Sequence, residues 1–373
     1  MSTNPFGGMF GDLFGILGKQ GPDVWFDTAR SLAHNVAVGD ATTVNPNPAT
    51  RSRLEEFAPL VARYLESDFT IPVSHDFSAV TRTGLTEAAL LQWRPLIEPS
   101  LPVAPAESGV SDDQASSMMN QLMGAIGPLF TGFQLGSVAG HFSERAWSLA
   151  VLPLPRITRE RLVHIDNVET FASEWSLDLD TTLVFALARE FAASELLTQP
   201  GVSDALRVLL LDASREALAS QGDIVGRLTS LDNPQDLMAL MSNPEGLLDG
   251  ITAPEDSSAT RAINAAAAAL RSVLDFVAFS ITEQIVGSAP QLREAYRRYR
   301  RSDARGEDSA AALFGISTQG EHQDAAEEWT AAIVREHGLG SLTALFRVDG
   351  LPSYHELSQP EEWWQRVISS PLA

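Results

Sequence analysis

The sequence predicts a mainly α-helical fold with few or no short strands. Apolar residues recur every three or four positions along most of the chain, which is the spacing that buries one face of a helix. The longest apolar segment, Ala259–Val286, holds five consecutive alanines, and small side chains allow a neighbouring helix to approach closely. We therefore expect this segment to be a central helix.

The first part of the chain predicts three helices joined by polar loops, at Asp23–Val38, Arg51–Glu66 and Thr86–Glu98. Thr86 is the expected N-cap of the third helix. Three short apolar runs are candidates for strands or loops: Phe69–Val73, Phe77–Val80 and Ile157–Val163. A Pro-rich linker at Ser100–Ser111 separates an N-terminal helical segment (1–110) from a helical core (111–373). We expect the two to form one cooperative unit.

Glycines recur every four or eight residues within the apolar region Gln114–Ala150. Because polar residues interrupt this region, it predicts a buried helical hairpin rather than a membrane span. The Phe-rich segment Phe6–Leu17 has helical spacing but is too short to cross a bilayer. We expect it to dock on its own domain, the alternative being a partner or a membrane surface.

The remaining helices follow from periodicity and capping signals. Asp180 is the expected N-cap of the helix Thr181–Leu197, and Pro200-Gly201 is expected to end it. Two short helices are expected within Asn233–Leu248, and a terminal helix is expected to pack the tryptophans of Glu361-Glu362-Trp363-Trp364. Further helices are expected at Val168–Glu174, Ser203–Gln221, Gln291–Arg301 and Asp324–His337.

Composition excludes several functional classes. The 373 residues include 26 Lys and Arg against 48 Asp and Glu, a formal net charge of -22, which disfavours binding to nucleic acid or to an anionic membrane. The absence of Cys excludes a disulfide scaffold and a cysteine nucleophile, and it fits a cytoplasmic protein. No segment predicts a transmembrane helix.

The most informative segment is the predicted helix around Arg189-Glu190-Phe191-Ala192-Ala193. It has the frame of a helical HExxH zinc motif, in which two histidines four residues apart bind zinc and the glutamate activates a water. Here Arg189 and Ala193 replace the two histidines, and neither side chain can ligate zinc. The seven histidines are scattered singly. The sequence therefore predicts no metal, and Glu190 is a remnant general base.

The order of short segments around this motif resembles the actinobacterial zincin-like metallopeptidase type 2 family, whose members are described as hydrolases and linked to deazaflavin-coenzyme biosynthesis. The resemblance covers nearly the whole chain. It is carried by Pro5-Phe6-Gly7-Gly8, Leu122-Met123-Gly124, Asn167-Val168, Phe171-Ala172, Ala312-Leu313-Phe314-Gly315-Ile316, Trp329, Leu351-Pro352 and Gln359-Pro360-Glu361. The resemblance implies a zincin-like helical domain, and zinc as the cofactor of active members.

The resemblance also places Asp275 where active members have their third-ligand glutamate. A buried carboxylate that loses its cationic partner costs about 3–5 kcal/mol. We therefore hypothesise that Arg189 replaces the charge of the metal and ties its helix to the one that carries Asp275. The alternative is that Arg189 points to solvent and the alignment is fortuitous.

One basic cluster, Tyr296–Arg301, interleaves arginines with tyrosines. Such a pattern can bind phosphates or a partner, and the alternative is an amphipathic helix whose arginines meet acidic surface. The candidate partner-binding residues are Arg297, Arg298, Arg300 and Arg301.

These observations predict a catalytically degenerate zincin-like protein that binds a peptide or protein in a remnant cleft without hydrolysing it. Two alternatives remain. One is an active metal-dependent hydrolase whose metal is held by carboxylates and a distant histidine such as His164. The other is a structural scaffold that binds partners through the Phe-rich N-terminus or the arginine helix. The sequence defines neither the partner nor the oligomeric state.

Overall fold

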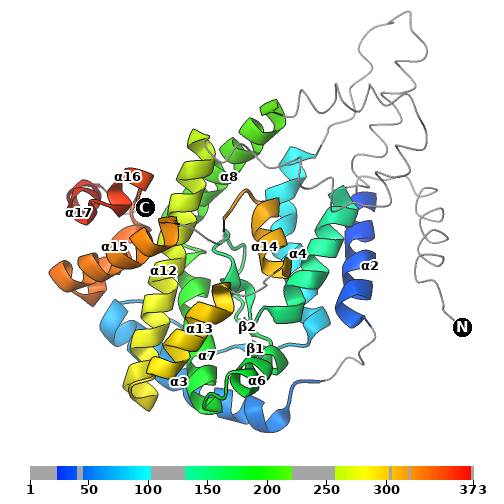
Figure 1. The fold of residues 1–373 in the computed structure, drawn as a ribbon, viewed down its shortest axis with the longest axis horizontal. Helices are drawn as coiled ribbons and strands as arrows, with labels where there is room; N and C mark the ends of the chain where they lie inside the picture. The colour runs from blue at the N-terminus through cyan, green and yellow to red at the C-terminus, as the bar shows by residue number, and fades with distance from the viewer. Residues whose placement is uncertain are drawn as a thin grey trace, which may run out of the picture.

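The computed structural model describes residues 23–39, 45–101, 131–220, 257–301, 305–317 and 321–370 (Figure 1). Nearly all regular structure in these ranges is helical. The two strands, β1 (Ser78–Ala79) and β2 (Leu162–Val163), have two residues each and pair in parallel, with Ser78 opposite Leu162. The prediction of a mainly α fold with few short strands is confirmed.

The N-terminal helices are α2 (Val24–Val38), α3 (Pro48–Phe69) and α4 (Arg82–Ile97), followed by the 3-10 turn η1 (Glu98–Ser100). The predicted N-cap of α4 is wrong. Thr81 caps the helix, with its Oγ1 accepting from the Gly84 amide at 3.1 Å, while Thr86 lies one turn inside and donates to the Arg82 carbonyl. Because a threonine one turn into a helix can bond back to the carbonyl four residues earlier, its presence does not mark the helix start.

Residues 131–145 form a helix that packs on α2 through the predicted glycines. A Cβ on Gly136 would lie 2.5 Å from the Ala29 carbonyl oxygen, so the two backbones approach as closely as glycine permits. The other half of the predicted hairpin lies outside the described residues. So do the predictions for Phe6–Leu17 and Asn233–Leu248.

The next helices are α6 (Ile165–Glu174), α7 (Leu179–Leu196) and α8 (Pro200–Ser220), after the 3-10 turn η2 (Leu149–Val151). Asp178, rather than the predicted Asp180, caps α7 by accepting from the Thr181 amide at 2.8 Å. Helix α7 ends at Leu196, ahead of Pro200 as predicted, and Pro200 then begins α8, because proline fits the first turn of a helix, where no intrahelical N–H bond is needed.

Helix α12 (Ser258–Val286) is the centre of the fold, as its alanine run predicts. It packs against α7, α8 and α15 (Glu321–His337) (Figure 1). By length and composition α12 is the one helix among the described residues that matches a membrane span, yet 89% of its apolar stretch is buried inside the protein. This burial is the pattern of a core helix.

The C-terminal part contains α13 (Pro290–Arg301), α14 (Arg305–Leu313), the 3-10 segment η3 (Leu339–Phe346), α16 (Tyr354–Leu357) and α17 (Pro360–Ile368). Sequence periodicity did not predict α14. The predicted terminal helix is α17, which buries Trp363 against Trp329 with ring centroids 4.7 Å apart. One hydrophobic core runs from Trp25 to Val367.

Candidate functional site

The motif helix α7 is buried around its whole circumference, because every residue from Thr182 to Leu196 is buried. A helix in this setting has no solvent-facing side for charged groups. Arg189, Glu190 and Glu195 all lie within this stretch, so each needs a partner inside the protein.

Arg189 points from α7 to α12. Its Nε donates to Oδ1 of Asp275 at 2.7 Å, and its Nη1 donates to the Ala150 carbonyl at 2.6 Å. Burial alone disfavours the Arg189 cation, but the nearby Tyr296 and Asp275 outweigh burial and raise its pKa. The hypothesised contact between Arg189 and Asp275 is therefore present, and the alternative that Arg189 points to solvent is wrong.

Asp275 is shared by more than one cation. Arg300 of α13 donates from Nη1 to Oδ2 of Asp275 at 2.7 Å, and the Tyr296 hydroxyl lies 3.4 Å from Oδ1. One carboxylate thus joins α7, α12 and α13. The single negative charge of Asp275 neutralises only one of the two arginines, Arg189 and Arg300, that contact it.

Glu190 has a different partner, which the sequence did not reveal. Arg156, in the connector before β2, donates from Nη1 and Nη2 to the two carboxylate oxygens at 2.7 and 2.8 Å, and the Leu162 amide donates to Oε1 at 3.2 Å. Both side chains are buried, and Glu190 is 0% exposed. This two-pronged pair is the strong form of the interaction. Neighbouring side chains on a helix diverge by about 100°, so Glu190 and Arg189 face different partners.

A second arginine of the same connector repeats the pattern. Arg161 donates from Nη2 to Glu195 at 2.6 Å and from Nε to the Ser194 hydroxyl at 2.9 Å. Two buried ion pairs therefore hold the connector against α7, and Glu190 lies beneath the connector.

This donor set does not fit a zinc ion. Arg189 and Ala193 offer no ligand atom, and the carboxylates of Glu190 and Asp275 already bond guanidinium groups. His164, the distant histidine of the alternative hypothesis, is buried, and burial together with Arg82 lowers its pKa to about 4. In the described part of the chain, no set of three ligand atoms that includes these residues lies close enough to share an ion.

A group with metal-ligand chemistry does occur elsewhere, at Glu336, His337 and Glu361 on α15 and α17. Both glutamates are exposed. His337 bonds Glu361 at 3.0 Å and stacks on the Trp364 ring with centroids 4.3 Å apart. A hydrogen bond and a ring stack therefore hold His337 beside Glu361.

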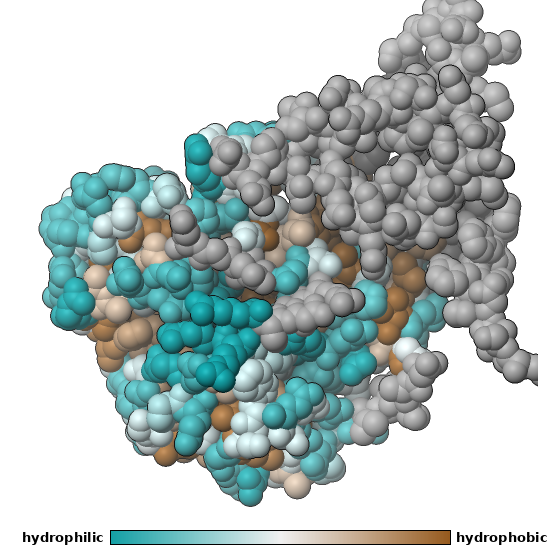
Figure 2. Space-filling model, in the orientation of Figure 1, coloured by the Kyte–Doolittle hydropathy of each residue, from teal (hydrophilic) through white to brown (hydrophobic). Residues whose placement is uncertain are grey.

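The four candidate partner-binding arginines of α13 all have acidic neighbours. Arg300 reaches Asp275, whereas Arg298 pairs with Glu294 of its own helix at 2.6 Å. Arg297 and Arg301 face α15, at 3.7 Å from Glu327 and 3.5 Å from Asp324 respectively. The last three pairs are exposed and contribute little to stability. Figure 2 shows strongly hydrophilic surface over α13.

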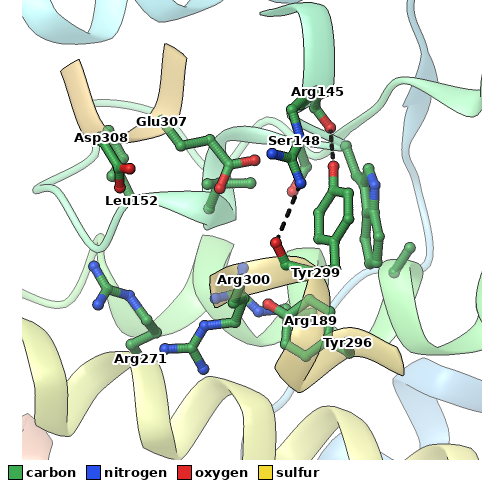
Figure 3. Close-up of a pocket in the computed structure, with 13 residues that line it drawn as sticks. Arg145, Ser148, Leu152, Arg189, Arg271, Tyr296, Tyr299, Arg300, Glu307 and Asp308 are labelled. Atoms are coloured by element: carbon green, nitrogen blue, oxygen red, sulfur yellow. Dashed lines mark hydrogen bonds between the residues drawn. The ribbon is translucent and has the colours of Figure 1, made fainter. Parts of the chain in front are cut away.

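Two hollows adjoin this charge cluster. A small one, with about 40 Å³ of room, lies between α12 and α14 and includes Arg189, Arg271, Arg300 and Glu307 (Figure 3). A larger groove of about 540 Å³ runs between α12, α13 and α15 and includes Asp275, Phe276 and Arg297. Tyr296 and Arg300 line both hollows. The sequence analysis missed several residues of this region, namely Arg156, Arg161, Glu195, Arg271 and Glu307. Arg271 is detectable as a charge inside an apolar helix, one turn before Asp275, whereas Arg156 lies in an irregular connector with no periodic signal.

Comparison with known proteins supplies the family. A model of the family described as "Zincin-like metallopeptidase" matches residues 24–364. No curated protein matches the chain. A solved structure from Chloroflexus aurantiacus, described as a "putative hydrolase with a novel fold", is similar in fold, with a TM-score of 0.60 and 16% sequence identity over 93% of this chain and 99% of that one. Because the family match spans most of the sequence, the chain belongs to the zincin-like metallopeptidase family.

Proposed function

We propose that this chain is a degenerate zincin-like protein that binds a peptide or protein partner in its remnant cleft without hydrolysing it. The observation that carries the proposal is the state of the motif helix. Its remnant base Glu190 is 0% exposed and forms a two-pronged ion pair with Arg156, and Arg189 at the first ligand position is bonded to Asp275.

Binding of a peptide is supported by the groove between α12, α13 and α15. Its volume of about 540 Å³ suits several residues of an extended chain. Aromatic side chains such as Phe276 and Phe279 line it beside arginines of α13. Peptidases bind peptides, so a family member that lacks the two histidines of the HExxH motif can still use such a groove to bind a peptide.

Metal analysis of the purified full-length protein, combined with a peptidase assay with and without added zinc, tests the proposal. We expect zinc far below one equivalent and no cleavage of a mixed peptide library. Tightly held zinc near one equivalent, or cleavage that Glu190→Gln abolishes, would overturn the proposal.

One observation favours a second candidate, a metal-dependent hydrolase with atypical ligands. Glu336, His337 and Glu361 offer two carboxylates and an imidazole within 4.8 Å of one another. If zinc is found, His337→Ala separates the two possibilities, because it removes the imidazole of this group and leaves α7 intact. Loss of both zinc and cleavage in His337→Ala would establish the second candidate.

A further inference from the structure

Arg271 on α12 is buried without an adequate partner. Its side chain points into the small hollow beside α14, and the residue is 4% exposed. Nη2 has no hydrogen-bond partner among the described residues, and the one bond of Nη1 is a long contact of 3.5 Å to the Gln323 amide oxygen. A buried guanidinium normally has a carboxylate or several hydrogen bonds, because stripping it of water is costly.

Two neighbouring arginines add to the positive charge around Arg271. Arg189 and Arg300 share the single carboxylate of Asp275. Burial, followed by repulsion from Arg300, lowers the pKa of Arg271 to about 10, so Arg271 remains a cation at neutral pH. Three arginines, Arg189, Arg271 and Arg300, therefore lie close to the one carboxylate of Asp275, in a chain whose formal net charge is -22.

Glu307 and Asp308 of α14 lie across the hollow from Arg271 and Arg300 (Figure 3). No ion pair joins Glu307 to a described residue, and burial raises the pKa of its carboxyl. Since Glu307 is not bonded to Arg271, the guanidinium keeps free donors that face the hollow.

The size of the hollow limits its occupant. One water needs about 10–15 Å³, so about 40 Å³ takes a small group such as a carboxylate but not a side-chain ring. Tyr296 and Arg300 also line the larger groove, which leaves room there for the rest of a ligand. The planar guanidinium fork matches the two oxygens of a carboxylate.

We propose that the hollow beside Arg271 binds a carboxylate of the peptide partner, while the rest of the peptide lies in the groove between α12, α13 and α15. This inference rests on the proposed peptide-binding function. The carboxylate is either the free C-terminus of the peptide or an acidic side chain, and both present the same two oxygens to Arg271.

Calorimetric titration of the full-length protein with synthetic peptides tests the inference. The probes are N-acetyl-trialanine with a free C-terminus, its C-terminal amide, and the amide of N-acetyl-Ala-Glu-Ala. We expect at least one carboxylate peptide to bind about tenfold or more tightly than trialanine amide, since a charge-assisted bond is lost in the amide. Whichever of the two carboxylate peptides binds more tightly shows whether the pocket takes a free C-terminus or an acidic side chain.

Arg271→Met removes the cation and keeps the length of the side chain. It is expected to abolish the preference for the acid while leaving the melting temperature unchanged or raised, because no unpaired charge is then buried. Arg261→Met is the matched control, since Arg261 is an exposed arginine on the same helix, and it should retain the preference.

The inference is overturned if no carboxylate peptide binds, if acids and amide bind alike, if Arg271→Met keeps the preference, or if inorganic phosphate binds more tightly than both acids. Failure of this inference and failure of the proposed function give different results. Acid and amide peptides that bind the wild-type protein equally tightly would leave the groove as a peptide site and overturn the carboxylate pocket alone. Zinc-dependent cleavage would sink the proposed function irrespective of the acid preference.

Discussion

Arg156 and Glu190 form a buried ion pair, and neither residue has a second ion-pair partner among the described residues. Replacing Arg156 by Met leaves the carboxylate of Glu190 buried with the Leu162 amide as its remaining donor among the described residues. We expect a loss of about 3–5 kcal/mol in the free energy of unfolding, measured by urea denaturation.

Arg159→Met is the control on the same connector, because Arg159 is exposed and its contact with Glu195 is 3.6 Å long. It should cost less than about 1 kcal/mol. The double variant Arg156→Met with Glu190→Met should recover much of the loss, since it removes both charges. Equal losses for Arg156→Met and Arg159→Met would show that the buried pair does not hold the connector.

His164 gives the protein a sensitivity to acid. Burial, helped by Arg82, lowers its pKa from 6.5 to about 4 in the folded state. Between these values the unfolded chain binds a proton that the folded protein does not, so stability is lost as the pH falls from about 6.5 to about 4. The full shift corresponds to roughly 3 kcal/mol.

We expect His164→Gln to lose less stability than wild type when urea midpoints at pH 7.5 and pH 4.5 are compared. His355→Gln, which changes an exposed histidine, serves as the control and should follow wild type. A pH response of His164→Gln identical to that of wild type would contradict the assignment.

At the scale of elements, the glycines of helix 131–145 set how closely it lies on α2. Gly136→Ala places a Cβ against the Ala29 carbonyl, so one helix must move. We expect a cost of about 1–3 kcal/mol from overpacking, measured as a lower urea midpoint. Gly84→Ala is the matched control, because its Cβ would meet side-chain atoms no closer than 3.4 Å. An unchanged urea midpoint for Gly136→Ala would contradict this prediction, because it would mean that the two helices can move apart without loss of stability.

Most helices were predictable, because the buried face of a helix places apolar residues every three or four positions in the sequence. The alanine run of α12 predicted a central helix, and a buried position is what the structure shows. The errors concern local capping. Thr86 and Asp180 were plausible caps, but Thr81 and Asp178 make the bonds, and a sequence offers several such candidates within one turn.

The site was partly predictable for a related reason. The contact of Arg189 with Asp275 followed from the hypothesis that an arginine replaces the charge of a metal, combined with a family resemblance. The pairing of Glu190 with Arg156 did not follow, because the irregular connector between η2 and β2 carries no periodic signal for the direction of its side chains. Arg271 was overlooked within an apolar helix, although a charged residue in such a helix is itself a signal.

At the scale of the whole molecule, one hydrophobic core unites the two predicted parts of the chain. It includes Trp25 near one end of the described residues and Val367 near the other, and α3 contacts both α7 and η3. A shared core of this kind favours unfolding as one cooperative unit. That organisation stays a prediction.

The link between Arg189 and Asp275 spans 86 positions of the chain. During synthesis, Arg156 and Arg161 leave the ribosome before α7 and can neutralise Glu190 and Glu195 as soon as that helix emerges. Arg189 must wait for Asp275, which takes roughly 4–17 s at about 5–20 residues per second. Throughout that interval Arg189 has no Asp275 to bind, and the side of α7 that packs on α12 in the folded protein has no partner.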